Sequence, residues 1–498
     1  MGANFNRILI VILALCLILA GCAADVPAGT TATTENVTTQ ATTEAAFETL
    51  NDAGPYFTTL SVGFGRVDIS PTESVPLRSY GGSAYRMSTE VQDPLYATCI
   101  ALTDSADNTA LLLTLDLTDA YGSVMDEARQ EISEATGVPF DAIMVSATHN
   151  YSSPDLENTQ EASIIPYIRL VKDGMLEAAE AALKDKDVAR VYIATAETEN
   201  LNFVRRYQLQ DTSYAGDHFG NFKNVPIADH ETKADNALQL VLFQREKKRD
   251  VLLANFQTHL LRESSGTNVT ADLVAPFREK LEDTLGCYVA YFTGASGNVN
   301  PTSRIAAENV TNNYVEQGHA LADCALDAYH TFQEIPTTSV QVNKTIYTAR
   351  VDHTYSDWGY LANEAMNYYR ANGELGNYEQ YLGWSGIRNV YHFNAVAIRS
   401  KMPWQLEIPL YGVSIGDLAF VTAPFELFDT NGMQIKETSP FSMTFVLSCA
   451  NDNLGYIPSE LAFKHGGYEV DMTLFARGTA EELVSSYQSI LNQLYFGS

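Results

Sequence analysis

Short apolar runs alternate with stretches of helical periodicity along the chain, from about residue 56 to its end. The run at residues 111–115 precedes a helix-like stretch over 124–135, and the run at 143–145 precedes another over 165–183. Four further runs have the length and composition of buried strands: 251–256, 288–292, 418–422 and 443–447. Continuous apolar strands that alternate with helices are typical of an α/β domain whose sheet is covered on both faces.

The globular part is predicted to be a single large α/β domain over residues 56–498, with a central mixed sheet covered by helices. It contains no second low-complexity linker, no internal repeat and no further apolar run long enough to span a membrane. An amphipathic stretch at residues 479–494, preceded by Gly478, predicts that the domain ends in a helix.

The N-terminal segment has a different pattern, an apolar run at residues 8–20 with Arg7 as the one charge before it. The run is shorter than the ~20 residues of a spanning helix and is typical of a secretory signal. It ends in Leu-Ala-Gly-Cys, which resembles the bacterial lipoprotein processing signal. Residues 1–21 are therefore predicted to be removed and Cys22 to be lipidated, and the alternative is an ordinary cleaved signal with a chance cysteine.

Residues 22–55 begin with the predicted lipidated cysteine, are rich in Thr and Ala, and have little apolar surface to bury, which predicts a flexible tether. The protein is then expected at the extracytoplasmic face of a bacterial cell membrane, held by its N-terminal lipid anchor. Its 31 Lys+Arg against 61 Asp+Glu give a net charge of −30. Such a surface repels anionic membranes, so association requires the anchor, and it repels phosphate backbones, which argues against nucleic acid as a partner.

Four cysteines remain if the signal is removed and Cys22 is acylated, and none has the close CxxC spacing of a thiolate zinc site. They are Cys99, Cys287, Cys324 and Cys449. Export permits disulfides, but the pairing of four dispersed cysteines has no signal in the sequence. We expect mostly buried thiols, and the sequence leaves the oligomeric state open.

Polar residues follow three of the predicted strands closely. His149 follows the run that begins at residue 143, His259 follows the run that begins at 251, and Glu426 follows the run that begins at 418. In open α/β sheets ligands gather outside the carboxyl ends of strands, and two histidines with a carboxylate suit Zn²⁺ with positions left for water and substrate. The residues alone leave other roles open, because each histidine could be a satisfied core residue and Glu426 could cap a helix that starts near Leu427.

A set of segments in conserved order resembles the N-terminal domain of neutral/alkaline, non-lysosomal ceramidases. The segments are residues 62–71, 93–97, 146–149, 203–207, 255–259, 294–301, 423–426, 450–456 and 466–470. The resemblance implies a zinc-dependent amidohydrolase that cleaves an N-acyl amide, such as a ceramide-like lipid, by a metal-activated water. Together with the N-terminal signal, it predicts a lipoprotein member of this family. It also implies a small-molecule or lipid amide as the substrate.

The family's site residues can be carried over position by position. The resemblance implies that His149, His259, Glu426 and Tyr456 are the zinc ligands. It implies that Arg205 and Tyr468 are catalytic residues that steady the negative charge on the substrate's carbonyl oxygen. Tyr151 stands at a family position with another residue, but its hydroxyl can donate to the same oxygen, so it is the third catalytic candidate; these seven positions are the candidate site.

Two positions depart from the family's pattern near these residues. Tyr151 stands where the family has a second histidine, and tyrosine titrates near 10 rather than near 6.5, so it is a poorer proton shuttle at neutral pH. Asn300 replaces a serine, which excludes an acyl-serine route there, and Asn298 replaces an aspartate. These departures support a second hypothesis, a lipid-anchored binding protein on the same fold with weak or no catalysis.

Overall fold

A large mixed sheet forms the centre of the protein in a computed structural model, which describes residues 60–78, 86–216, 225–337, 339–383 and 385–497. Its strands are β1 (Ser61–Asp68), β5 (Tyr96–Thr103), β6 (Thr109–Leu115), β7 (Ile143–Ala147), β8 (Asp187–Glu197), β13 (Ala237–Arg245), β14 (Val251–Phe256), β16 (Tyr288–Thr293) and β18 (Gln333–Ile335). The order is β16-β14-β13-β8-β1-β5-β6-β7, and β18 also pairs with β8. The outer pairs β14/β16 and β6/β7 are parallel, whereas the inner pairs are antiparallel.

A second sheet packs against this one. Its strands are β19 (Val340–Arg350), β20 (Gln405–Ile415), β21 (Leu418–Ala423) and β23 (Met443–Ser448), in that order. The pair β21/β23 is parallel and the other pairs are antiparallel. Short strands complete the fold: β2 (Pro76–Leu77), β3 (Arg86–Met87), β4 (Glu90–Val91), β9 (Phe203–Val204), β10 (Arg206–Leu209), β11 (Tyr214–Gly216), β12 (Ile227–His230), β15 (Asn268–Val269), β17 (Val299–Asn300), β22 (Glu426–Leu427) and β24 (Tyr456–Ile457).

The large sheet folds over, so that its two edges meet. Its halves are joined through β1 and β8 by only two residue pairs. At the far side, the Thr114 hydroxyl of β6 donates to the Tyr291 carbonyl of β16 at 2.6 Å, and the Thr293 hydroxyl donates to the Thr148 carbonyl at 2.7 Å. A bridge between Ser146 and Ala450 joins the β7 edge to the chain that follows β23. The carboxyl ends of strands from both sheets therefore meet in one place.

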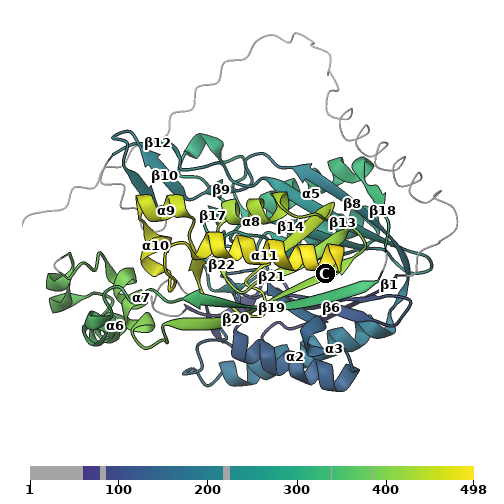
Figure 1. The fold of residues 1–498 in the computed structure, drawn as a ribbon, viewed down its shortest axis with the longest axis horizontal. Coiled ribbons are helices and arrows are strands. Elements are labelled where there is room, and N and C mark those ends of the chain that lie inside the picture. Colours follow the sequence, from purple (N-terminus) through teal and green to yellow (C-terminus); the bar gives the residue numbers. More distant parts are fainter. Residues whose placement is uncertain (1–59, 79–85, 217–224, 338, 384, 498) are drawn as a thin grey trace, which may run out of the picture.

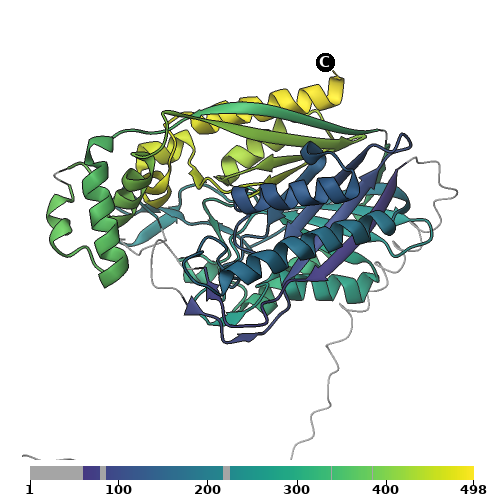
Figure 2. The same cartoon turned by 90° about the horizontal axis from the view of Figure 1, so that it is seen from below.

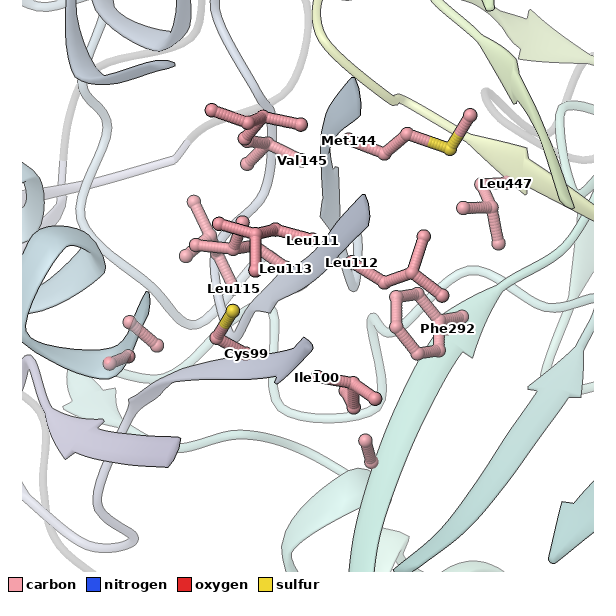
Figure 3. Close-up of a cluster of buried hydrophobic side chains, with 14 of the residues drawn as sticks. Cys99, Ile100, Leu111, Leu112, Leu113, Leu115, Met144, Val145, Phe292 and Leu447 are labelled. Atoms are coloured by element: carbon pink, nitrogen blue, oxygen red, sulfur yellow. The ribbon is translucent and has the colours of Figure 1, made fainter. Parts of the chain in front are cut away.

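The core lies between these layers. Figure 3 shows Leu111, Leu113 and Leu115 of β6 on one side of the strand and Leu112 on the other, next to Phe292 of the opposite half. All these side chains are buried. Because alternate residues of a strand face opposite sides of the sheet, a strand that is covered on both faces must be apolar at every position.

Helices cover the outer faces of the sheets. They are α2 (Gly122–Thr136), α3 (Ile164–Lys184), α4 (Val274–Leu285), α5 (Tyr314–Asp327), α8 (Asp429–Glu437) and α11 (Thr479–Phe496), while the short helices α9 (Glu460–His465) and α10 (Tyr468–Met472) lie beside the sheets. Figure 2 shows α2 and α3 side by side across the N-terminal strands, while α11 lies over β19 and β20. Close packing of α3 requires glycine in β1, because a Cβ at Gly63 would lie 1.9 Å from the Ala182 carbonyl oxygen.

A pair of helices between β19 and β20 stands apart from these layers. The pair consists of α6 (Gly359–Asn372) and α7 (Val390–Arg399), which Figure 1 shows at one end of the molecule. It has a small core of its own, in which Met366 packs near Phe393 and Val396. The apolar and polar pattern of the chain did not predict this pair.

The predicted fold class is confirmed, a single large α/β domain with a central mixed sheet covered by helices. All six apolar runs form strands, and the predicted final helix is α11. Cys99, Cys287 and Cys449 are buried free thiols and Cys324 is a half-buried one, as expected. The predicted signal, Cys22 and the tether lie outside the described residues. Among the described helices, none combines the length and apolar composition needed to cross a membrane.

Candidate metal centre

Three sequence-predicted ligands lie at strand ends that the folded sheets bring together. His149 follows β7, His259 follows β14, and Glu426 follows β21 as the first residue of β22. His149 has φ 63°, a left-handed conformation that is uncommon for a residue with a side chain. Such strain persists where surrounding structure over-determines it, and it is concentrated at functional sites.

The two imidazoles and the carboxylate face one another. The Glu426 Oε2 atom lies 3.4 Å from His149 Nε2 and 3.2 Å from His259 Nε2. The other ring nitrogens lie near backbone carbonyls, His149 Nδ1 2.9 Å from the Thr118 oxygen and His259 Nδ1 3.0 Å from the Val299 oxygen. Since a carbonyl oxygen can only accept, both Nδ1 atoms carry the proton. Both Nε2 atoms therefore face the space beside the carboxylate.

This space fits a metal ion. His149 Nε2 and Glu426 Oε2 are both buried and have no hydrogen-bond partner among the described residues. Leaving buried polar atoms unsatisfied costs about 1–3 kcal/mol each, so such atoms indicate a group that satisfies them. The ligand atoms of His149, His259 and Glu426 lie within 4.8 Å of one another. Two histidine nitrogens and one carboxylate are a ligand set of catalytic zinc sites.

The charges of the three groups also suit a cation. Burial alone would raise the pKa of Glu426, but the neighbouring imidazoles hold it well below its usual value, so the carboxylate is ionised. Burial lowers the pKa of His259 to about 4. Burial would also lower the pKa of His149, but Cys449, Tyr151 and Glu426 raise it well above 6.5. Without a metal, His149 thus carries the positive charge that the carboxylate needs, and a metal ion would replace that proton.

The other four predicted site residues lie around this centre. The Tyr151 ring lies 5.3 Å from the His149 ring, edge to face. Tyr456 opens β24, which pairs in parallel with β22 so that Tyr456 stands opposite Glu426. The Tyr468 ring lies 5.6 Å from the Tyr456 ring. The structure therefore brings all seven predicted residues together, while their individual roles stay predictions.

Arg205 is fully buried beside the two tyrosines and the second histidine. Its guanidinium carbon lies 5.5 Å from the Tyr456 ring and 5.8 Å from the Tyr468 ring. One of its Nη atoms is 3.3 Å from His259 Nε2. The other Nη donates to the Gly297 carbonyl at 2.9 Å, which holds the guanidinium in place.

A chain of buried ion pairs supports Arg205 from behind. Glu469 accepts from Arg205 Nε at 2.8 Å and from Arg206 Nη1 at 2.9 Å, and Glu231 accepts from Arg206 Nε at 2.6 Å. The four side chains are 0–4% exposed. Charges so deeply buried are tolerated only when each has its partners, so the chain holds every member in one geometry.

Two asparagines at the departures from the family's pattern also have defined contacts. Asn300 Oδ1 accepts from Arg205 at 3.3 Å. Asn298 donates to the Asp429 carboxylate at 2.7 Å and accepts from the Asp429 backbone N–H at 2.9 Å. An aspartate at position 298 could not donate to Asp429, so the amide is matched to its neighbour in this chain.

The alternative that Glu426 caps a helix is wrong. Helix α8 begins at Asp429, and its N-cap residue, Phe428, provides no side-chain cap. The reason is that residues 426–427 form β22, whose pairing with β24 directs the carboxylate toward the imidazoles. The reading of His149 as a satisfied core histidine also disagrees with its unpartnered Nε2 atom.

Sequence reasoning missed two residues on the far side of His149. Asp119 Oδ1 lies 3.4 Å and Cys449 Sγ lies 3.5 Å from His149 Nδ1. These three residues form a second group of possible metal ligands, but Nδ1 faces the Thr118 carbonyl and therefore carries a proton. Asp119 follows β6 and Cys449 follows β23 directly, so the strand-end rule that found His149 could have found both.

A cavity of about 560 Å³ opens onto the centre. Glu426, Tyr151, Tyr456 and Tyr468 line it, and so do residues of the α6–α7 pair. The remaining lining residues are Arg78, Asp119, Tyr121, Asp155, Glu157, Arg370, Asn394, Ile398, Asn453, Leu454, Gly455, Met472 and Leu474. The centre is thus accessible to a small or narrow substrate.

Comparison with known proteins locates the fold. No protein-family model matches the chain, and no curated protein sequence matches it. The neutral ceramidase from Pseudomonas aeruginosa is similar in structure, with a TM-score of 0.65 and 15% sequence identity over 89% of this chain and 75% of that chain. A ceramidase complexed with C2 gives the same score and identity over 88% and 76%. The expected ceramidase-like fold is confirmed, and at this identity the likeness concerns the fold alone.

Proposed function

We propose that the protein is a zinc-dependent amidohydrolase that cleaves N-acyl amides of the ceramide-like, lipid class. The observation that carries the proposal is the convergence of His149, His259 and Glu426 on one buried space beside a cavity that Glu426 lines, with unpartnered ligand atoms on His149 and Glu426. The likeness of the fold to ceramidases supports the reaction class. The predicted signal and Cys22 support a location at the outer face of a bacterial membrane.

His149, His259 and Glu426 would hold the zinc ion, with Tyr456 beside Glu426 as a fourth ligand. When bound, zinc supplies Lewis acidity, which polarises a carbonyl group and makes a water molecule acidic enough to attack at neutral pH. The backbone carbonyls at Thr118 and Val299 keep both imidazoles in the tautomer that a metal requires. Binding therefore needs no rearrangement of the rings.

The remaining residues steady the charge that develops on the substrate's carbonyl oxygen. Arg205 is held by Glu469 and the Gly297 carbonyl, so its N–H groups are fixed before the reaction begins. Burial raises the pKa of Tyr468, so its hydroxyl keeps its proton at neutral pH and can donate. Tyr151 lines the same cavity and can donate as well. Loss of one such donor typically costs ~10²–10³ in turnover.

Fatty acid release from a panel of N-acyl amides tests the proposal. The zinc-replete protein should cleave at least one member, lose the activity after treatment with a chelator, and regain it when zinc is added back. The His149→Ala variant should be inactive under the same conditions. Turnover by a metal-free His149→Ala protein would contradict the mechanism.

A lipid-anchored binding protein without efficient catalysis is the second candidate. Two observations favour it: Tyr151 is a poor proton shuttle, and the Arg205 N–H lies within hydrogen-bond distance of the His259 Nε2 atom that a metal would use. The same panel separates the two functions. A zinc-replete protein that binds lipid amides and cleaves none would support the binding function.

A further inference from the structure

The cavity that leads to the metal centre contains one charge without a counter-charge. Six charged side chains line it, and most of them are paired. Arg78 lies 3.2 Å from Asp155, 3.0 Å from Glu157 and 3.7 Å from Asp119. Glu426 faces the imidazoles. The sixth is Arg370 of α6, which has no ion pair among the described residues.

An arginine without a carboxylate is unexpected in this protein. The chain has 61 Asp+Glu against 31 Lys+Arg, so a cation has about two carboxylates to pair with on average. Within the part of the chain that the structure describes, Arg370 instead makes one hydrogen bond, from Nη2 to the Asn394 Oδ1 atom of α7 at 3.4 Å. A guanidinium has five N–H donors in a planar fork. Most of these donors remain available at the wall of the cavity.

The neighbouring lining residues indicate the chemistry of the rest of the ligand. Ile398, Leu454, Met472 and Leu474 line the same cavity and provide an apolar wall for an alkyl chain. A carboxylate matches the guanidinium fork with two parallel hydrogen bonds. A doubly charged phosphate would bind the fork too, but Asp155 and Glu157 in the same cavity repel two charges more than one.

We infer that the amide substrate carries a carboxylate that Arg370 binds, which makes N-acyl amino acids or the monoamides of dicarboxylic acids the preferred substrates. The inference rests on the proposed function and narrows its substrate class. In the reaction, water adds to the amide carbonyl, the C–N bond breaks, and a proton from water passes to the leaving nitrogen. The products are a carboxylic acid and an amine, one of which also carries the recognised carboxylate.

Three matched amides test the inference with the full-length, zinc-replete protein. N-lauroylglycine has the carboxylate on the amine half, the mono-dodecylamide of succinic acid has it on the acyl half, and N-lauroylethanolamine has none. The wild-type protein should cleave one of the two carboxylate-bearing amides with a kcat/KM at least tenfold above that for the neutral amide. The amide that is preferred shows which half of the substrate lies toward Arg370.

Variants at position 370 separate recognition from structure. Arg370→Gln should lower kcat/KM for the preferred carboxylate by about 10-fold to 100-fold, the range for losing charge-assisted hydrogen bonds, and leave the neutral amide unchanged. Arg370→Lys should recover part of the loss because it keeps the charge without the fork. Lys401→Gln is the control, because Lys401 is an exposed cation bonded to Asn363 outside the cavity. Since Arg370 is exposed and in the last turn of α6, thermal unfolding checks its effect on the helix.

The outcomes distinguish a failure of the carboxylate inference from a failure of the proposed amidohydrolase function. Equal cleavage of charged and neutral amides by the wild type, or an equal loss on both in Arg370→Gln, would overturn the inference and leave the amidohydrolase intact. If the wild type cleaves none of the three amides, the proposed function fails. Calorimetric binding of N-lauroylglycine then tests whether Arg370 binds the carboxylate. Weaker binding in Arg370→Gln than in Lys401→Gln supports it, and equal binding in both variants contradicts it.

Discussion

The metal centre and the α6–α7 pair contribute to one cavity but are held in different ways. The centre's ligands lie at strand ends of two packed sheets, and hydrogen bonds between the sheet's edges, such as Thr293 to Thr148, hold those ends together. The α6–α7 pair has its own small core and is joined to the rest mainly through α10. Under the proposed function, the chemistry would be built into the core, whereas the choice of substrate would lie on the segment between β19 and β20 that carries α6 and α7, the insert.

Helix α10 connects the two regions. It carries Tyr468 and Glu469 toward the metal centre, and Asp471 toward the insert. Asp471 accepts from Arg388 Nε at 2.6 Å and from Asn389 Nδ2 at 2.5 Å. Changes on either side of this five-residue helix should therefore affect different kinetic parameters.

The largest effect is expected from Glu469→Gln, which removes one carboxylate from between two buried arginines. Breaking a buried pair typically costs about 3–5 kcal/mol, and Arg205 would lose its fixed position, with a fall in kcat of ~10². Chemical denaturation and initial rates measure both effects. The matched control is Glu460→Gln, an exposed carboxylate paired with Arg477, which should change neither. A normal kcat in Glu469→Gln would show that catalysis does not require Glu469 to hold Arg205 in place.

An intermediate effect is expected on zinc affinity as a function of pH. His149 is protonated without metal because its pKa is raised, whereas His259 has a pKa of about 4 and Glu426 is ionised. Zinc binding between pH 5 and 7 should therefore release one proton, so the apparent affinity rises about tenfold per pH unit. A chelator competition titration at several pH values measures the slope. A slope of two would mean that a second ligand, His259 or the Tyr456 phenol, also loses a proton, and a slope of zero would mean that His149 is neutral in the metal-free protein.

The smallest effect is expected from Asp471→Asn, which loosens the insert from α10. KM should rise a few-fold with kcat and zinc content nearly unchanged, because the metal centre keeps its own supports, and stability should fall by about 1 kcal/mol. Asp357→Asn, an exposed change on the same insert, is the control. A fall in kcat as large as that of Glu469→Gln would show that the insert and the centre act as one unit.

The strands and much of the site could be predicted because both follow from local pattern. A strand buried on both faces is apolar at nearly every position, as at residues 111–115, where Thr114 is the exception, and the polar residue after such a strand marks the sheet's edge, as His149 and His259 do. The family resemblance then added Arg205, Tyr456 and Tyr468, whose convergence no spacing reveals.

The parts of the fold and the site that the sequence did not predict depend mostly on contacts between distant segments. The role of Glu426 requires the pairing of β22 with β24, which joins residues about thirty positions apart, and this two-residue strand has no pattern of its own. Helices α6 and α7 pack mainly on each other, and the buried face of α6 consists of small residues and one methionine: Gly359, Ala362, Ala365 and Met366. Asp119 also follows a strand end, that of β6, but the chain has 61 Asp+Glu and 9 His, so a carboxylate at a strand end is a weaker signal than a histidine.

Zinc content is the most direct test of the central claim that His149, His259 and Glu426 bind one metal ion. Elemental analysis of the purified, zinc-replete wild type should give one zinc per chain, and His149→Ala should retain essentially none. His353→Ala, which changes a histidine bonded to Ser356 on the insert, should keep the full amount. A wild type without zinc, or a His149→Ala protein that holds a full equivalent, would contradict the account.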